Sequence, residues 1–292
     1  MTDKPAAPSS STISVGLIGS GIGKSLTPAM HMAEGARQGL RYDYALMDTA
    51  ALGESPGLLA RLVDQAEAEG YRGLNITHPF KQEILNLLTE TSADVEALGA
   101  CNTVVFENGS RTGHNTDWSG FTRSFKRGLP DAAMGKVVQV GAGGAGAATA
   151  YALLLMGAGQ IEVFDVDRER AERLAARLNA LGRGGRVKAG NVLESALRRC
   201  DGVVQATAVG MESYPGTPFD PELLSPANWL AEVIYFPAQT ALLQAAAKIG
   251  CRTLTGAGMA VFQAVTAFEL FAGRAADPNA MLRHFDSLVT IS

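Results

Sequence analysis

The sequence predicts an α/β protein of two domains, each built around an open and mostly parallel β-sheet. Short apolar segments rich in β-branched residues alternate with segments of helical periodicity, which is the pattern of sheets covered by helices. The alternation runs to residue 117, is interrupted by one helical segment, and starts again at residue 136. A chain of 292 residues with 47% hydrophobic content is long enough to bury the cores of two such domains.

In the first half of the chain, strand and helix segments follow one another directly. Residues 13–19, ISVGLIG, form an apolar run that ends in glycine, and Thr27 is placed to cap a helix that begins at Pro28. The next predicted elements are a strand at 41–48, a helix at 58–70, a strand at 71–77 and a helix at 79–88. The sequences TVVFE and SRTGHN then flank Asn108-Gly109, a dipeptide typical of tight turns, and predict a β-hairpin.

The second half opens with a helical segment at 118–129, so we place the domain boundary near residue 118. The strand KVVQV at 136–140 and an alanine-rich helix follow, and further strands are predicted at 160–164, 185–190, 201–207 and 229–236. Residues 259–273 have helical periodicity, but the sequence alone leaves their packing partner open. Residues 1–12, rich in Pro, Ser and Ala, are expected to form a disordered tail.

Composition narrows the classes of partner. The formal net charge is −4 and no basic run occurs, which argues against nucleic acid and anionic membranes and favours small molecules. No apolar run reaches the roughly 18 residues of a membrane helix, and the first residues do not resemble a signal peptide. Cys101, Cys200 and Cys251 lie far apart without metal-ligand spacing, so we expect buried packing cysteines, no metal site and a cytoplasmic protein.

A glycine motif identifies the second half as a dinucleotide-binding domain. Gly141, Gly143 and Gly146 follow an apolar strand and open a helix, the context in which this spacing forms a Rossmann fingerprint. The first glycine permits the tight turn, the second admits a diphosphate and the third allows close packing of helix on strand. The cofactor-site candidates of this loop are Gly141, Gly143, Gly144, Ala145 and Gly146.

The residue that ends the next strand bears on the identity of the dinucleotide. Asp165 lies about 20 residues beyond the motif, where a carboxylate accepts hydrogen bonds from the adenosine ribose. Such a carboxylate suits NAD and repels the 2′-phosphate of NADP, so NAD is the expected cofactor and NADP the less favoured one. Arg168 and Arg170 either offset this repulsion or lie on the solvated face of the following helix, and we include Arg170 among the candidates.

One lysine occupies an unexpected place. In GLNITHPFKQEIL, Pro79 suits the first position of a helix, which puts Lys81 in the first turn. The positive end of the helix dipole disfavours a cation there by roughly 0.3–1 kcal/mol. Lys81 is therefore either a functional cation or a solvated surface lysine.

Other polar residues gather where predicted strands of the first half end. They are Ser25, Thr27, Asn75, Thr77, Asn102, Asn115, Thr116 and Asp117. Hydroxyls and amides of this kind suit a polyhydroxylated substrate, because buried polar groups each need a hydrogen-bond partner. Taken singly, Thr27 and Asp117 read as helix caps and the asparagines as residues that tie turns together. Together with a cofactor motif they indicate an active site.

Six segments, in this order and spread over nearly the whole chain, resemble the shikimate dehydrogenase family. They are GKSLTPAMH, NITHPFK, GACNTV, GHNTDWSGF, VGAGGAG and GMAVFQAVTAFELF. The resemblance implies a substrate-binding catalytic domain at 13–117, completed by C-terminal helices at 257–292, and a Rossmann NAD-binding domain at 118–256. The active site is expected between them.

The resemblance also implies a role for individual residues. Lys81 and Asp117 form the catalytic pair, Ser25 and Thr27 meet the substrate carboxylate, and Thr77, Asn102 and Gln263 hold hydroxyls. Tyr235 borders the pocket. The nicotinamide half of the cofactor site is lined by Ala208, Val209, Gly210, Met211, Val233 and Gly256. Under this reading Lys81 is a proton shuttle.

Two departures from the pattern of the NADP-dependent biosynthetic members favour one subgroup of the family. Asp165-Val166-Asp167 replaces the Asn-Arg-Thr of NADP-dependent biosynthetic members, and Ser25-x-Thr27 replaces their Ser-x-Ser. With PAMHMAEG, these features resemble the NAD-dependent quinate/shikimate dehydrogenases of quinate catabolism. The expected activity is oxidation of the C3 hydroxyl of quinate and shikimate to 3-dehydroquinate and 3-dehydroshikimate, by a monomer or homodimer.

Two alternatives stay open. One is an NADP-dependent shikimate dehydrogenase of aromatic amino-acid biosynthesis, against which Asp165 argues. The other is a non-catalytic NAD-binding metabolite sensor, against which the presence of both Lys81 and Asp117 argues. A short-chain dehydrogenase is disfavoured because no Tyr-x-x-x-Lys occurs, and a metal-dependent alcohol dehydrogenase because the histidines and cysteines form no ligand cluster.

Overall fold

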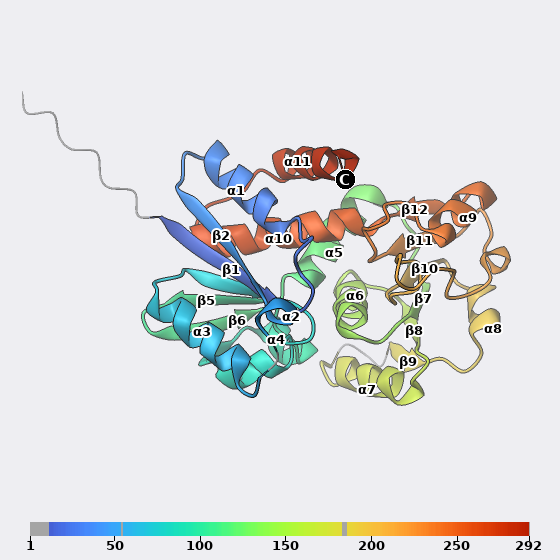
Figure 1. Cartoon of the computed structure of the whole chain (residues 1–292). Coiled ribbons are helices and arrows are strands. Elements are labelled where there is room, and N and C mark those ends of the chain that lie inside the picture. Colours follow the sequence, from blue (N-terminus) through green and yellow to red (C-terminus); the bar gives the residue numbers. More distant parts are fainter. Residues whose placement is uncertain (1–11, 54, 183–185, 292) are drawn as a thin grey trace, which may run out of the picture.

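The computed structural model describes residues 12–53, 55–182 and 186–291, so all but Thr12 of the predicted tail lies outside the described residues. Two sheets, each with its own helices, lie side by side and are joined by long helices (Figure 1). This confirms the predicted α/β class. Among the described residues, no helix has both the length and the hydrophobicity to cross a membrane.

The first sheet has the strand order β2-β1-β3-β5-β6-β4. Its strands are β1 (Ile13–Gly19), β2 (Tyr42–Asp48), β3 (Gly73–Ile76), β4 (Glu90–Thr91), β5 (Thr103–Glu107) and β6 (Ser110–His114). Its helices are α1 (Thr27–Arg37), α2 (Thr49–Leu52), α3 (Leu58–Ala68) and α4 (Ala93–Leu98). Strand β1 pairs in parallel with β2 and β3, whereas β5 pairs antiparallel with β3 and β6.

The predicted hairpin is confirmed. Strands β5 and β6 are joined by Asn108 and Gly109, which adopt φ angles of 52° and 77°. Positive φ at both central residues is the signature of the type I′ turn that the Asn-Gly dipeptide favours.

The second sheet is parallel throughout, in the order β12-β11-β10-β7-β8-β9. Its strands are β7 (Lys136–Val140), β8 (Gln160–Phe164), β9 (Val187–Ala189), β10 (Gly202–Gln205), β11 (Trp229–Glu232) and β12 (Arg252–Leu254). The order reverses between β7 and β10, and ligands of such sheets bind outside the carboxyl ends of the strands at this switch point.

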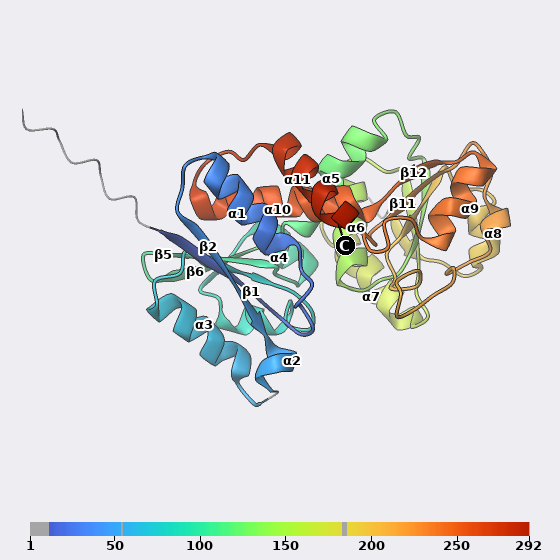
Figure 2. The ribbon, with the colours of Figure 1, turned by 45° about the horizontal axis from the view of Figure 1, so that its top comes forward.

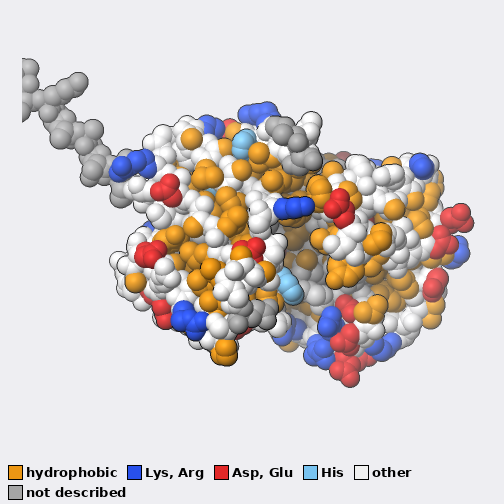
Figure 3. Space-filling model, viewed as in Figure 1, with side chains coloured by type: hydrophobic (Ala, Val, Ile, Leu, Met, Phe, Trp, Pro, Cys, Tyr) orange, Lys and Arg blue, Asp and Glu red, His pale blue; other side chains and the backbone are white. Residues whose placement is uncertain are grey.

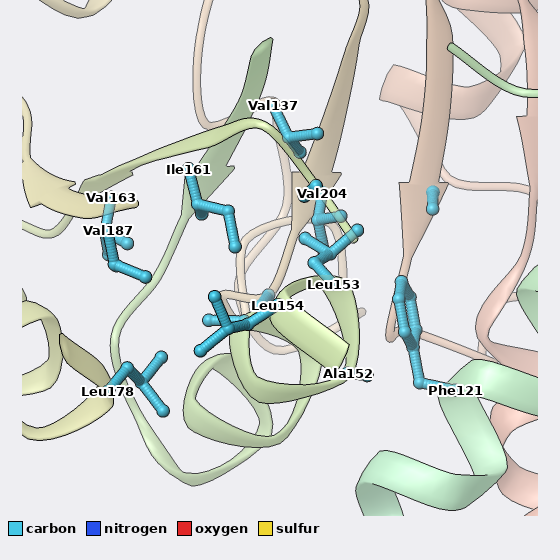
Figure 4. Close-up of a cluster of buried hydrophobic side chains, with 14 of the residues drawn as sticks. Phe121, Val137, Ala152, Leu153, Leu154, Ile161, Val163, Leu178, Val187 and Val204 are labelled. Carbon is cyan, nitrogen blue, oxygen red and sulfur yellow. The ribbon is translucent and has the colours of Figure 1, made fainter. Parts of the chain in front are cut away.

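Helices cover both faces of this sheet. They are α6 (Gly144–Leu155), α7 (Arg168–Asn179), α8 (Leu193–Leu197) and α9 (Ala241–Ile249), with a 3₁₀ turn η2 (Pro221–Leu223) before β11. Leu153 and Leu154 of α6 pack on the strands, as do neighbouring apolar side chains of α7 (Figure 4). This burial fixes the start of α6 at the end of β7.

Two long helices lie between the sheets, α5 (Asp117–Gly128) and α10 (Gly256–Ala272), and α11 (Pro278–Ile291) follows (Figure 2). Phe268 and Phe271 of α10 are buried in one cluster with Val15, Tyr42 and Val105 of the first sheet. The segment whose partner the sequence left open therefore packs on the first domain. Helix α5 also contacts α6, with the rings of Trp118 and Tyr151 edge to face at 5.6 Å.

Two local predictions are wrong. The segment 79–88 forms a turn after a cis peptide bond at His78-Pro79, and only a short 3₁₀ helix, η1 (Glu83–Leu87). The carbonyl of Lys81 accepts a hydrogen bond from the N–H of Cys101 at 2.8 Å instead of one along a helix. Helix α1 begins at Thr27 itself, without a side-chain cap, and the Ser25 hydroxyl accepts from the Thr27 N–H at 3.3 Å.

Candidate active site

The ion pair between Lys81 and Asp117 lies where the two domains meet. Lys81 follows β3 and Asp117 is the first residue of α5, and Lys81 Nζ lies 2.5 Å from Asp117 Oδ2. The Asp117 side chain is 5% exposed and that of Lys81 25% exposed, so the pair is accessible only from the lysine side. The space-filling view shows a hollow between the two halves of the molecule (Figure 3).

Asn102 connects this pair to its surroundings. Its side-chain amide nitrogen donates to Asp117 Oδ1 at 2.9 Å and lies 3.3 Å from Gln263 Oε1 on α10. Its side-chain oxygen accepts from the N–H of Thr116 at 2.7 Å. The structure thus brings together four predicted site residues, Lys81, Asn102, Asp117 and Gln263, from four separate segments.

Asp117 is fixed by its backbone as well. Its N–H donates to Asn115 Oδ1 at 3.1 Å, and the Asn115 side chain donates to the carbonyl of Ala100 at 3.0 Å. Cys101, between Ala100 and Asn102, is buried, and burial raises the pKa of its thiol to about 12. That cysteine therefore stays a neutral thiol that packs, as the sequence predicted.

The remaining substrate-site candidates are Ser25, Thr27, Thr77 and Tyr235, and among the described residues none of these four forms a hydrogen bond with the ion pair. Thr77 lies against Gly19, because a Cβ added to that glycine would come within 2.3 Å of Thr77 Cγ2. The loop after β1, which carries Ser25 and Thr27, is therefore adjacent to the loop after β3. Tyr235, after β11, is 39% exposed, and its ring lies 6.2 Å from that of Phe285 on α11.

The glycine loop has the shape that a dinucleotide requires. A Cβ added to Gly141 would come within 2.6 Å of the Ala206 carbonyl oxygen, and one added to Gly146 within 2.2 Å of the Gly141 oxygen. Gly143 and Gly144 instead have no atom of a described residue within 4 Å of an added Cβ, so their outer side is open. Helix α6 has no side-chain cap, which leaves the first N–H groups, including that of Ala145, directed at this space.

Asp165 lies beside the glycine loop, immediately after β8. Its carboxylate accepts from the N–H of Ala142 at 2.8 Å and from the N–H of Asp167 at 2.9 Å. A carboxylate has about four acceptor positions, so Asp165 retains capacity for a ribose. Val166 is fully exposed next to it.

The two nearby arginines are occupied by acidic neighbours. Arg170 pairs with Asp167, with Nε 3.2 Å from Oδ2, and Arg168 pairs with Glu172, with Nε 2.7 Å from Oε1. Both side chains are more than half exposed.

The candidates for the nicotinamide half lie at the ends of β10 and β11. Ala208, Val209, Gly210 and Met211 form a turn after β10, in which the Gly210 N–H donates to the Tyr214 carbonyl at 2.7 Å. Val233 follows β11, and its carbonyl oxygen lies within 2.3 Å of a Cβ added to Gly256 at the start of α10. All of these residues therefore lie at the carboxyl edge of the second sheet, on the side of the glycine loop.

Comparison with known proteins identifies the family. Residues 17–104 match the model of the shikimate dehydrogenase substrate-binding domain. The shikimate dehydrogenase (NADP(+)) of Streptomyces avermitilis is 54% identical over 92% of this chain and 93% of its own. The chain belongs to the shikimate dehydrogenase family. The resemblance seen in the six sequence segments is confirmed.

Other members of the shikimate dehydrogenase family are similar over their full length. The quinate/shikimate dehydrogenase (NAD(+)) of Corynebacterium efficiens is 48% identical over 95% of this chain and 99% of its own. Quinate dehydrogenase from Corynebacterium glutamicum in complex with NAD superimposes with a TM-score of 0.90 at 48% identity, covering 94% of this chain and 99% of its own. Shikimate 5-dehydrogenase from Thermus thermophilus with NADP(H) and shikimate gives 0.83 at 30% identity, covering 94% and 99%. Relatives at similar distance are thus named for different dinucleotides.

Sequence reasoning missed several residues that support the site of this family member. The Tyr44 hydroxyl donates to Asn75 Oδ1 at 2.7 Å, and the Asn75 amide nitrogen lies 3.0 Å from the Thr103 hydroxyl beside Asn102. Gln139 and Gln205 are fully buried beneath the cofactor loops. Tyr44, Gln139 and Gln205 each resemble a core strand residue in the sequence, and only their hydrogen bonds in the folded protein distinguish them.

Proposed function

We propose that this protein oxidises the C3 hydroxyl of quinate and shikimate with NAD, yielding 3-dehydroquinate and 3-dehydroshikimate. The observation that carries the proposal is the Lys81–Asp117 pair, held by Asn102 at the meeting of the two domains. Residues 13–117 with the C-terminal helices act as the substrate domain and residues 118–256 as the NAD domain. The expected cytoplasmic location and monomeric or dimeric state belong to the same proposal, and the unpaired, buried cysteines agree with a reducing compartment.

Two covalent bonds of the substrate must break, the C3–H bond and the hydroxyl O–H bond, as the C=O bond forms. NAD, when bound, would supply the acceptor for the hydride. The hydroxyl proton passes to the Lys81–Asp117 pair. Asn102, one of the two amide side chains expected to hold the substrate, donates to Asp117 Oδ1, and its nitrogen lies 3.3 Å from Oε1 of the other, Gln263. Asp117 orients Lys81, and the hydrogen bonds from Asn102 and from its own N–H to Asn115 keep that carboxylate in place.

The substrate carboxylate binds at the start of α1 in this proposal. Ser25 and Thr27 offer hydroxyls there, and α1 has neither a side-chain cap nor an acidic residue in its first turn. The unpaired N–H groups and the helix dipole favour an anion at such an end. Thr77, from the adjacent loop, contributes a further hydroxyl.

The residues of the second domain fit NAD. Gly143 and Gly144 leave room for a diphosphate on the uncapped end of α6, and Asp165 is placed to accept from the ribose hydroxyls. The 2′-phosphate of NADP would meet the Asp165 carboxylate and the apolar Val166, while Arg168 and Arg170 are paired with acidic neighbours. These contacts favour NAD over NADP.

A second candidate is an NADP-dependent shikimate dehydrogenase, favoured by the name of the 54% identical Streptomyces avermitilis relative. Initial rates with quinate and shikimate, each with NAD and with NADP, separate the two. The proposal predicts turnover of both substrates with NAD, and ¹³C NMR of the products should show a carbonyl at C3. Turnover of shikimate alone, with NADP alone, would establish the second candidate. The absence of any turnover, with NAD binding retained, would indicate a non-catalytic sensor.

A further inference from the structure

Two fully buried glutamines lie beneath the loops proposed to hold the dinucleotide. Gln139 is the next-to-last residue of β7 and Gln205 the last residue of β10, and these two strands are neighbours at the switch point of the sheet. Gln205 is in register with Val140, so the side chains of Gln139 and Gln205 point to opposite faces of the sheet. The mechanism above uses neither residue.

Gln139 ties together the two ends of the glycine loop. Its amide nitrogen donates to the carbonyl of Gly141 at 3.0 Å and to that of Gly146 at 2.7 Å. Its amide oxygen accepts from the Thr149 hydroxyl at 2.9 Å. Both amide hydrogens and one oxygen lone pair are therefore used, and the curvature of the loop between the two glycines is fixed from below.

Gln205 does the same for the loop that follows β10. Its amide oxygen accepts from the N–H of Thr207 at 2.5 Å, and its amide nitrogen donates to the carbonyl of Val209 at 2.7 Å. The Thr207 hydroxyl accepts from the N–H of Val209 at 3.1 Å. This turn leads directly to Gly210 and Met211, which are proposed to line the nicotinamide half of the site.

We propose that Gln139 and Gln205 are positioning residues, each for one half of the dinucleotide. Gln139 shapes the loop for the diphosphate and Gln205 shapes the loop for the nicotinamide ring. Leucine has a similar size but no polar group. At position 139 it would remove the amide donor from the carbonyls of Gly141 and Gly146, and at position 205 it would remove the donor to the Val209 carbonyl and the acceptor of the Thr207 N–H, so each loop would relax. A loop held in its binding conformation in advance lowers the cost of binding. The inference rests on the proposed NAD-dependent function.

Titrations with two ligands, NAD and ADP-ribose, distinguish the two halves of the proposed dinucleotide site. ADP-ribose carries both phosphates of NAD but lacks nicotinamide. Calorimetric titration should show that Gln139→Leu weakens NAD and ADP-ribose alike, by about tenfold. Gln205→Leu should weaken NAD by about tenfold while ADP-ribose stays within about twofold. The KM for NAD should rise in both variants.

Asn228 offers a matched control. It is a buried amide of the same domain, just before β11 and thus at the opposite end of the sheet, and its nitrogen donates to the Cys200 carbonyl at 2.6 Å. Asn228→Leu should lower Tm while leaving the affinities for NAD and ADP-ribose unchanged. If a leucine variant does not fold, as judged by circular dichroism, Gln139→Asn and Gln205→Asn shorten the same amides by one methylene and should show the same pattern.

The outcomes separate the inference from the function on which it rests. Wild-type protein that binds neither NAD nor ADP-ribose contradicts the proposed function itself. Wild-type protein that binds both, with glutamine variants that match it within twofold, overturns the inference alone. Equal losses of both ligands in both variants would also overturn it, because they would show a general loss of structure and not a division between the two halves.

Discussion

Lys81 Nζ lies 2.5 Å from Asp117 Oδ2, although 36 residues separate the two in the chain. The pair joins the loop after β3 to the start of α5, a helix that also packs against the second domain. Because Asp117 is nearly buried and Lys81 is not, a substrate bound as proposed would approach the pair from the lysine side.

Lys81→Ala is expected to lower kcat by about 10²–10⁴-fold, the usual contribution of a positioned acid–base group. The affinity for NAD should change little, because Lys81 lies in the first domain and the glycine loop in the second. Steady-state kinetics and calorimetry measure the two quantities. Wild-type kcat in Lys81→Ala at its pH optimum would contradict the proton-transfer role.

Asp117→Asn should produce a loss of kcat of similar size, since the amide keeps the shape but cannot orient the ammonium group as a charged partner. Glu107→Gln is the control, because it removes an exposed carboxylate whose Oε1 lies 3.3 Å from Arg72 Nη2. Exposed ion pairs of this kind contribute little. Equal activity of the Asp117 and Glu107 variants would show that the charge of Asp117 is not needed.

Asp165→Asn combined with Val166→Arg should narrow or reverse the preference for NAD. The first change removes the charge that repels a 2′-phosphate, and the second places a guanidinium at an exposed position beside it. Measurement of kcat/KM with both dinucleotides tests this. Asp165→Asn combined with Val166→Leu is the matched control, because it removes the charge of Asp165 without adding a guanidinium group for the phosphate. A double variant with an unchanged ratio would mean that Asp165 does not set the preference.

Glu232 should make stability depend on pH. Burial raises the pKa of this carboxyl group to about 7. The Thr240 hydroxyl donates to Glu232 Oε2 at 2.8 Å, whereas Glu232 Oε1 accepts no hydrogen bond from any described residue. The unfolded chain releases this proton near its ordinary value of 4.5. Between these pH values the folded state binds more protons at Glu232 than the unfolded state does. The stabilising contribution of this group to the free energy of unfolding is therefore full below about pH 4.5 and is lost as pH rises through about 7.

Glu232→Gln should remove this slope and make the protein more stable than wild type at pH 8, by up to about 3 kcal/mol. Urea unfolding at several pH values between 5 and 8.5 measures the difference. The exposed Glu222→Gln serves as control and should follow the wild-type curve. Parallel curves for wild type and Glu232→Gln would show that the buried carboxyl does not titrate in this range.

Periodicity and turn chemistry predicted most of the fold. Strands β1, β7 and β8 have the predicted bounds, and the Asn108-Gly109 turn formed as expected, because each depends on residues close in sequence. The helix expected at 79–88 failed because the Lys81 carbonyl bonds to Cys101, a contact that local pattern does not reveal. Lys81 therefore lies in a turn before η1 and not in the first turn of an α-helix, so the predicted effect of a helix dipole on its ammonium group was wrong.

The candidate site, like the fold, was predictable from the sequence only in part. Residue patterns predicted Lys81, Asn102 and Asp117 as site candidates, the family resemblance gave their roles and added Gln263, and the hydrogen bonds that link the four residues agree with one site. The glycine loop follows from spacing alone. Gln139, by contrast, acts on backbone two and seven residues away through a geometry that only the folded loop creates, so no sequence pattern indicated it.

The ratio of kcat/KM for NAD to that for NADP in the wild-type enzyme tests the central claim most directly. In the proposed binding mode Asp165 would accept hydrogen bonds from two ribose hydroxyls of NAD and would repel the 2′-phosphate of NADP. Charge-assisted hydrogen bonds contribute enough that we predict a ratio of about 10² or more in favour of NAD. Initial rates with shikimate as the common substrate give this value. Equal kcat/KM values for the two dinucleotides, or a preference for NADP, would contradict the account.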